Sequence, residues 1–451
     1  MVSSCPLTQE RQRRSNVGYA LKIINKMKRT NVRWTVVALI FFATTVNYID
    51  RQVIGLLKPY IQDDLGWTEV DYGYIVTAFQ VAYGIGMVLG GRMLDRLGSK
   101  LGYSIAIIVW SLGAVLHAAV RSVTGFGAAR AVLGLGEAGN FPAAVKVIAE
   151  WFPKRDRAFA TGLFNSGTTI GAVIAPIIVT AITLEWGWRW AFIVTGMLGF
   201  IWVAVWWLMY HSPKKHPRVN AAELEYIQDE EDGPNGPDGQ EESEGRQITW
   251  RQLFQYRQTY AILFSRFVTD WVWWFFLFWT PDFLNKTHGV DLKATVLPLI
   301  IIYTMSSIGG IYGGHVSSQF IRLGRSVNFA RKTTILLFAL LVLPLNAVPY
   351  IHNIWIVVLI IGLATSTHQA WASNIFTIVS DVYPKQVVGS MTGISSVGGA
   401  VGGALASSFV GLILEWTGSY AYIFMIASTM YLLAWLTLRL FVPIRQIDFS
   451  R

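Results

Sequence analysis

The sequence reads EWFPKRDRAFATGLFNSGTTIGAVIA at residues 150–175 and DVYPKQVVGSMTGISSVGGAVGGALA at residues 381–406. The two stretches align without a gap at an offset of 231 residues, which pairs Pro153/Pro384, Lys154/Lys385, Thr161/Thr392, Gly162/Gly393, Gly167/Gly398, Gly171/Gly402 and Ala175/Ala406. An ungapped match of this length indicates that the chain consists of two related halves. Parallel repeats of this kind occur in secondary transporters, which bind substrate near the membrane midplane between their halves.

The composition around both copies is strongly apolar. Of 451 residues, 53% are hydrophobic and only 14% are charged, with a mean hydropathy of +0.43. A soluble chain carries roughly 25% charge, so these values argue against a soluble enzyme and exclude a disordered chain. The apolar runs are long and continuous, which excludes an outer-membrane barrel with its short alternating strands. The single cysteine, Cys5, rules out an intrachain disulfide and a cysteine metal cluster.

Twelve apolar stretches have about the 20 residues that span a membrane as a helix. They lie near 34–57, 70–91, 101–120, 124–148, 158–182, 188–210, 260–284, 294–317, 329–349, 352–379, 387–413 and 419–442. We therefore expect an all-α membrane protein with twelve transmembrane helices in two pseudo-symmetric halves. The expected division is a basic N-terminal segment (1–33), a first half (34–210), a linker with an acidic, disordered-like stretch (211–259), a second half (260–443) and a tail (444–451).

The distribution of basic residues predicts the orientation. Most of the 37 lysines and arginines fall in segments that would share one side of the membrane with both termini. The segments on the other side carry only Lys58, Arg121, Arg189, Lys286 and Lys293. This bias predicts that both termini and the linker are cytoplasmic. The net charge of +10 is thereby explained by topology, and we expect no nucleic-acid partner.

Four ionisable residues lie inside two of the predicted spans, where they are costly and therefore candidates for function. Asp50 and Arg51 lie in the first span, and Arg130 and Glu137 lie seven residues apart on one face of the fourth. One interpretation is a set of ion pairs that hold the two helices together. The interpretation we prefer is a site where arginines bind an anion's carboxylate and the two acids exchange protons.

Further polar residues within the spans leave more than one interpretation open. Arg266 and Asp270 are spaced to form a local salt bridge, and the repeat offset pairs His368 with Glu137, which predicts either a site residue or a core histidine. Side chains suited to bind a polyol, by hydroxyls, amides or flat apolar rings, are Tyr83, Asn165, Ser166, Trp274, Gln369, Trp371, Ser373, Asn374 and Ser396.

Several motifs carry a family resemblance. GRMLDRLGSK (91–100) and RAVLGLGEA (130–138) resemble signatures of the major facilitator superfamily. NYIDR (47–51), EAGNFP (137–142), EWFPKRDR (150–157) and NFARK (328–332) together resemble its anion:cation symporter family. Within that family, HQA (368–370), DVYP (381–384) and the Arg266/Asp270 pair are most similar to the hexuronate transporter branch.

The resemblance implies roles for individual residues. It implies proton coupling by Asp50 and Glu137, and it implies a gating motif that includes Gly91, Asp95, Arg96 and Gly98. It implies substrate binding by Tyr48, Arg51, Tyr83, Arg130 and Trp274. Thr168 and Ser396 depart from the galactonate-type residues of the family, which favours a hexuronate.

The expected activity is import of glucuronate or galacturonate with protons by alternating access. The alternatives are another organic anion (galactonate, glucarate, tartrate or phthalate) and sodium as the coupling ion. No catalytic motif or metal-ligand spacing is present, so we expect neither an enzyme nor a bound cofactor. We expect a monomer in a bacterial inner membrane, because each chain contains both halves.

Overall fold

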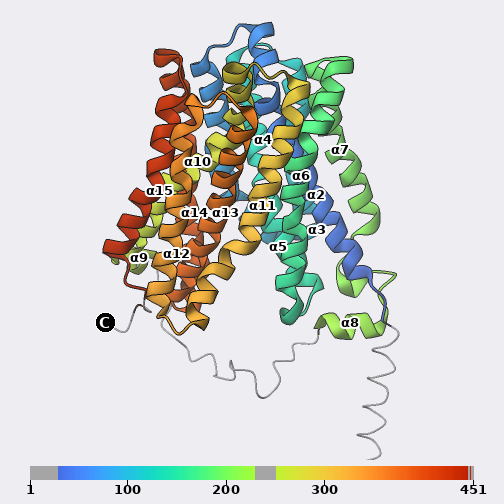
Figure 1. The fold of residues 1–451 in the computed structure, drawn as a ribbon. Helices are drawn as coiled ribbons and strands as arrows, with labels where there is room; N and C mark the ends of the chain where they lie inside the picture. Colours follow the sequence, from blue (N-terminus) through green and yellow to red (C-terminus); the bar gives the residue numbers. More distant parts are fainter. Residues whose placement is uncertain (1–28, 229–249, 445–446, 448–451) are drawn as a thin grey trace, which may run out of the picture.

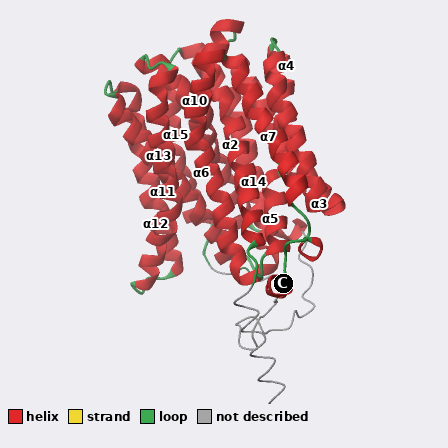
Figure 2. Cartoon of the chain, turned by 90° about the vertical axis from the view of Figure 1, so that its right-hand side faces the viewer, coloured by secondary structure: helices red, strands yellow, loops and turns green. Residues whose placement is uncertain are grey.

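The computed structural model describes residues 29–228, 250–444 and 447, and in this part of the chain every regular element is a helix (Figures 1 and 2). Eleven helices are long and apolar enough to cross a membrane. The expected all-α membrane fold is therefore confirmed. The acidic stretch expected within the linker lies outside the described residues, as do residues 1–28 of the basic N-terminal segment.

The first half contains six elements, which are α2 (Val32–Leu65), α3 (Glu69–Ala119), α4 (Val123–Glu137), α5 (Asn140–Trp151), α6 (Lys154–Trp186) and α7 (Trp188–Met209). Two predicted spans are joined in α3, which bends at Gly98, where φ is 75°. Glycine tolerates this left-handed region without strain. The predicted fourth span is instead divided into α4 and α5, because the helix is interrupted at Ala138 and Gly139.

The second half repeats this order with α10 (Arg257–His288), α11 (Leu292–Arg322), α12 (Val327–Val342), η2 (Leu343–Tyr350), α13 (Ile354–Val382), α14 (Lys385–Thr417) and α15 (Ala421–Phe441). Three short elements, η1 (Pro213–Lys215), α8 (Ala221–Gln228) and α9 (Trp250–Leu253), lie between the halves in sequence. We call the end of the bundle that carries α8 the linker end (bottom of Figure 1) and the opposite end the distal end.

The repeated glycines give both halves the same helix packing. A methyl group at Gly171 of α6 would lie 2.6 Å from the carbonyl oxygen of Thr45 in α2. A methyl group at the equivalent Gly402 of α14 would lie 2.2 Å from the carbonyl oxygen of Phe267 in α10. Small residues let helices approach until their backbones touch. The repeat read from sequence therefore corresponds to equivalent contacts, α6 on α2 and α14 on α10.

Local sequence signals fix the helix ends. The Thr68 hydroxyl accepts a hydrogen bond from the Asp71 backbone and the Asp71 carboxylate accepts one from the Thr68 backbone, a complete capping box at the start of α3. The Asp291 carboxylate caps the start of α11, because it accepts a hydrogen bond from the backbone N–H of Ala294. Gly66, Gly289 and Gly418 end α2, α10 and α14 at the distal end.

Candidate functional site

A buried charge cluster lies where α2 meets α4. Asp50, Arg51, Arg130 and Glu137 are each at most 4% exposed. The Arg51 Nε donates to Glu137 Oε2 at 2.8 Å, and Arg130 Nη2 donates to the carbonyl oxygen of Arg51 at 3.0 Å. The structure thus brings the four residues together, with one direct ion pair between the two helices.

The cluster contains more polar atoms than its own hydrogen bonds use. Both carboxylate oxygens of Asp50 lack a hydrogen-bond partner among the described residues, and so does Glu137 Oε1. Arg130 Nε and Nη1 are likewise unpartnered. An unsatisfied buried polar atom costs roughly 1–3 kcal/mol. A set of charges that served only to join helices would be expected to satisfy these atoms, so the cluster retains capacity for a further ligand or proton.

Aromatic rings from both halves surround Arg51. Its guanidinium carbon lies 4.7 Å from the ring centre of Tyr48, 4.9 Å from that of Tyr83 and 5.8 Å from that of Trp274. Tyr48 and Tyr83 belong to the first half, whereas Trp274 lies on α10 of the second. Cation–π contacts of this kind stabilise a cation that is removed from water. Arg51 therefore lies at the interface between the halves.

A cavity of about 650 Å³ opens between the halves next to this cluster. From the first half, Tyr48, Asn165 and Thr169 line it, and from the second half Gln369 and Ser373 line it. Its remaining polar lining consists mainly of hydroxyl groups, and none of the described residues that line it carries a charge. A neutral, hydroxyl-rich wall with aromatic rings suits a polyhydroxylated ligand whose negative charge binds a neighbouring arginine.

Other predicted site residues lie outside this cavity. His368 Nδ1 is hydrogen-bonded to the Tyr431 hydroxyl at 2.7 Å, and its ring stacks on Trp273, which corresponds to the core-histidine interpretation. Asn374 donates to the carbonyl oxygens of Gly313 and Ala370. Ser396 donates to the Thr392 carbonyl oxygen within its own helix. None of these three lines the cavity.

Trp371 is also not available as a flat face for a sugar ring. The side chain is completely buried and packs edge-on against Tyr431. Trp273, which directly precedes Trp274 on α10, lines the cavity instead. Aromatic residues are so frequent in this helix that residue type alone did not separate core rings from cavity rings.

The sequence interpretation missed the contribution of α11. Tyr303, Ser306, Ser307 and Gly310 all line the cavity. Their spacing places them on one face of the helix, which is the pattern of a polar stripe in a membrane span. That stripe could have been found from sequence. The Ser307 hydroxyl also donates to Thr169 of α6 at 3.1 Å, which joins the two halves at the cavity wall.

Arg266 and Asp270 form the predicted local salt bridge, with 2.8 Å between Nη2 and Oδ2. The pair belongs to the second half and is nearly buried. The Arg266 guanidinium carbon lies 4.8 Å from the ring centre of Phe376, and Phe376 lines the cavity. A second arginine is therefore separated from the cavity by one aromatic ring, as Arg51 is by Tyr48.

A second charge network closes the distal end. Lys58 Nζ lies 2.7 Å from Asp282 Oδ2 and 2.6 Å from Glu69 Oε2. Lys286 pairs with the same Glu69, and the Tyr420 hydroxyl donates to Asp282. We expected Lys58 and Lys286 as loop charges, but Lys58 is completely buried because it joins α2 and α3 to α10.

Hydrogen bonds between the halves continue below this network. The Tyr72 hydroxyl donates to the Phe278 carbonyl oxygen at 2.8 Å, and the hydroxyls of Thr77 and Ser408 lie 2.7 Å apart. Toward the linker end the packing differs. Methyl groups built at Gly91 of α3 and Gly162 of α6 would meet no atom within 4 Å. The hydrogen bonds named here therefore join the halves on the distal side of the cavity, whereas Gly91 and Gly162 on its linker side face open space.

The predicted gating motif lies at the linker end of α3. Gly98 forms the bend of the helix, and Arg96 is exposed. The side chain of Asp95 lies outside the described part of the structure. An acidic residue not singled out from sequence, Glu150, accepts hydrogen bonds from Ser99 and Tyr210, each at 2.6 Å.

Two related helical halves around a polar cavity, closed at one end and flanked by buried arginines, define a membrane transporter. The chain belongs to the Major Facilitator Superfamily, whose family model matches residues 40–371. It is a transporter and not an enzyme. The resemblance to the anion:cation symporter type within this superfamily is likewise confirmed.

Relatives and a solved structure agree with this assignment. The chain is 33% identical over 405 residues to the "Probable galactarate/D-glucarate transporter GudP" of Bacillus subtilis (strain 168), which covers 87% of this chain and 88% of the relative. It is 29% identical over 393 residues to the "Hexuronate transporter" of Escherichia coli (strain K12). This match covers 87% of this chain and 90% of the relative. A bacterial homolog to the human lysosomal transporter Spinster has the same fold, with a TM-score of 0.74 at 17% identity, covering 93% of this chain and 100% of that one.

Proposed function

We propose that this protein imports a hexuronate, such as glucuronate or galacturonate, together with protons. The observation that carries the proposal is Arg51, a buried cation whose one carboxylate partner among the described residues is Glu137 and whose aromatic neighbour Tyr48 lines the cavity. A carboxylate on the substrate can bind such an arginine through two parallel hydrogen bonds. The hydroxyl-rich cavity wall then suits the sugar ring.

Exchange of carboxylates couples the substrate to a proton. A buried arginine requires a counter-anion, because an unpaired buried charge costs several kcal/mol. When the substrate carboxylate binds Arg51, Glu137 is displaced and becomes an unpaired buried acid in turn. Protonation of Glu137 removes that cost. Each anion that binds therefore favours uptake of one proton, and release of the anion returns Glu137 to Arg51 and expels the proton.

Asp50 provides a second position for a proton. Its carboxylate is buried beside the same cluster, and neither oxygen is hydrogen-bonded among the described residues. With one proton per monoanion, transport moves no net charge. With two protons per monoanion, one net positive charge crosses the membrane, and the membrane potential then contributes a free energy of roughly 2.3 kcal/mol per 100 mV. That corresponds to roughly fifty-fold accumulation per 100 mV.

The orientation follows from the basic residues, which favour a cytoplasmic linker end. In this orientation the conformation described here has its outer side closed by the ion pair of Lys58 and Asp282. It corresponds to the step at which substrate leaves during import. The localisation we propose is the inner membrane of a bacterium, with both termini in the cytoplasm.

The test is uptake of radiolabelled glucuronate into proteoliposomes under an inward proton gradient without sodium. We expect galacturonate to compete strongly and a neutral hexose not to compete. If no acidic sugar is taken up under the gradient, the proposal is wrong. Uptake that requires sodium and ignores the pH gradient would replace the proton with sodium as the coupling ion.

A second candidate substrate is an aldarate dianion such as galactarate or glucarate. The observation that favours it is Arg266 of the second half, which packs against the cavity-lining Phe376 and could bind a second carboxylate. Conversion of Arg266 to Gln distinguishes the two substrates. For a hexuronate carrier we expect little change in glucuronate affinity, whereas an aldarate carrier should lose affinity for glucarate by roughly tenfold or more.

A further inference from the structure

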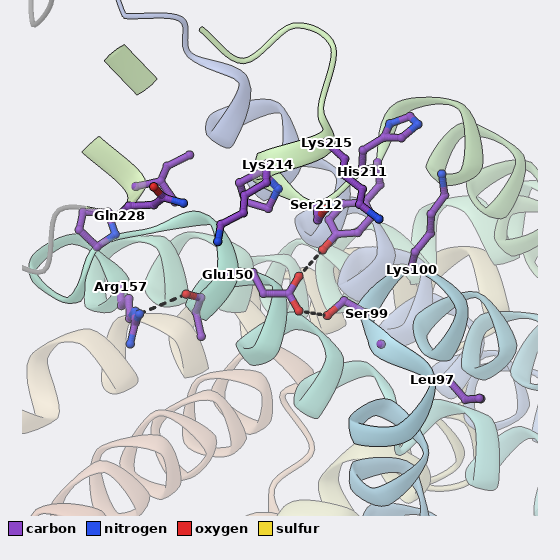
Figure 3. A pocket seen from close by; sticks show the side chains of 16 residues that line it. Leu97, Ser99, Lys100, Glu150, Arg157, His211, Ser212, Lys214, Lys215 and Gln228 are labelled. Atoms are coloured by element: carbon purple, nitrogen blue, oxygen red, sulfur yellow. Dashed lines mark hydrogen bonds between the residues drawn. The ribbon is translucent and has the colours of Figure 1, made fainter. Parts of the chain in front are cut away.

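A second cavity, of about 750 Å³, lies at the linker end of the first half and takes no part in the proposed transport site (Figure 3). Its walls come from the bend of α3, the junction of α5 and α6, the segment after α7 and the end of α8. Four cationic side chains line it, which are Lys100, Arg157, Lys214 and Lys215. Among the described residues, Glu150 is the one carboxylate in the lining.

Within the described part of the chain, the lining residues do not neutralise the positive charge of this pocket. Both oxygens of Glu150 are already hydrogen-bonded to the hydroxyls of Ser99 and Tyr210. Figure 3 shows Arg157 and Lys214 on one side of Glu150 and Lys100 on the other. A further polar group, Nδ1 of His211, is buried in the lining and lacks a hydrogen-bond partner among the described residues.

The backbone holds two of the cations in place. Arg157 donates from Nε to the Phe152 carbonyl oxygen at 3.0 Å and from Nη2 to the Ala149 carbonyl oxygen at 3.1 Å. Lys100 Nζ donates to the Trp207 carbonyl oxygen at 2.9 Å. Lys214 and Lys215 are exposed, so their ammonium groups remain available to an incoming ligand. A partly ordered group of cations of this kind favours a phosphate-bearing anion.

The surface beside the pocket is apolar, which points to a lipid. Leu208 at the end of α7 is 80% exposed, and Trp207 is 48% exposed with the Lys100 ammonium 5.3 Å from its ring centre. Leu97, which lines the pocket, is also exposed. Tryptophan and lysine at the end of a span are typical of the headgroup level of a membrane. A free phosphate would gain nothing from these side chains, whereas acyl chains would cover them.

We propose that this pocket binds the phosphate headgroup of an anionic phospholipid, with Lys214, Lys215 and Arg157 at the phosphate and the acyl chains along the end of α7. Basic pockets at the membrane surface bind such headgroups in other membrane proteins. The bound lipid would connect the bend of α3 to the α5–α6 junction and to the start of the linker. These segments come from three separate parts of the chain.

The test compares lipids by thermal unfolding of the full-length protein in neutral detergent, followed by the fluorescence of its 19 tryptophans. Phosphatidylglycerol should raise the unfolding temperature by a few degrees over phosphatidylcholine at the same mole fraction. The double variant K214A/K215A should lose most of this shift. The matched control R322A/R325A, which removes two exposed cations from the linker end of the second half, should keep it.

Two outcomes would overturn the proposal. An equal shift in the wild type and in K214A/K215A would show that phosphatidylglycerol acts elsewhere. A shift produced by millimolar inorganic phosphate alone and lost in K214A/K215A would show a site for a free phosphate anion instead of a lipid. Native mass spectrometry provides an independent readout, because the wild type should retain phosphatidylglycerol and the double variant should retain less of it.

Discussion

Lys58 of α2 and Asp282 of α10 lie 2.7 Å apart and are both completely buried, so one ion pair joins the two halves at the distal end. Lys58 also pairs with Glu69, and together the three residues join α2 and α3 to α10 at the distal end. In a protein that alternates between two openings, such a pair stabilises one of the two states. Its removal should shift the population toward the other state.

Conversion of Asp282 to Asn should open the distal end. Loss of the Lys58 partner is expected to disfavour the closed state by more than 1.4 kcal/mol, which corresponds to about a tenfold change in population. A cysteine introduced at the buried Ser407, in a Cys5-to-Ser background, reports the change through its rate of labelling by a maleimide. The control is Asp64 to Asn, which breaks an exposed distal salt bridge with Arg189 inside one half. Equal labelling in both variants would contradict a gating role for the buried pair.

Conversion of Glu137 to Gln should separate substrate movement from proton movement. The amide cannot pair with Arg51 as an anion, so the substrate carboxylate meets no competitor and no proton is needed. We expect exchange of labelled for unlabelled glucuronate to persist while accumulation driven by a pH gradient is lost. Glu185 to Gln, a change at an exposed position on α6, should leave both activities intact. Gradient-driven accumulation in the Glu137 variant would remove this residue from the coupling mechanism.

Conversion of Arg51 to Lys keeps the charge but removes the fork that binds a carboxylate through two hydrogen bonds. A hydrogen bond to a charged group contributes about 1.5–3 kcal/mol, so glucuronate affinity should fall roughly 10- to 100-fold. Binding can be measured by isothermal titration calorimetry on the purified protein. Arg189 to Lys, at an exposed distal position, serves as the control. Unchanged affinity in the Arg51 variant would show that the carboxylate binds elsewhere.

Two glycines of α6 should respond differently to alanine. At Gly171 the added methyl group would lie 2.6 Å from the Thr45 carbonyl oxygen, so Gly171 to Ala should destabilise the protein by about 1–3 kcal/mol. At Gly162 the methyl group would meet no atom within 4 Å, so Gly162 to Ala should be neutral or slightly stabilising. Thermal unfolding in detergent measures both effects. A larger loss at Gly162 than at Gly171 would contradict the packing of α6 on α2.

The fold was predictable because its determinants are local or repeated. Apolar length identified the spans, and the ungapped repeat predicted equivalent packing at Gly171 and Gly402. The closeness of Arg51 to Glu137 followed from the cost of isolated charges in a membrane, which requires partners for each. The break between α4 and α5 was not predicted, because the length of the stretch 124–148 fits a single span and gives no weight to Gly139 and Pro142 within it.

Contacts between distant helices could not be predicted in the same way. Lys58 and Lys286 lie at the ends of apolar spans, where a sequence gives no means to distinguish a loop charge from a buried partner of Asp282. His368 has the position equivalent to Glu137 but packs against Trp273 and Tyr431, because the two halves have different neighbours at this level. Sequence symmetry therefore predicts the backbone more reliably than the chemistry of each side chain.

The most direct test of carboxylate exchange at Arg51 is proton movement during glucuronate uptake. Proteoliposomes that contain a trapped pH-sensitive dye, at symmetric pH and without sodium, should acidify inside when glucuronate is added outside. The Glu137-to-Gln protein should take up labelled glucuronate by exchange without acidification. Uptake by the wild type with no change in internal pH would contradict the account, since substrate binding at Arg51 would then require no proton on Glu137.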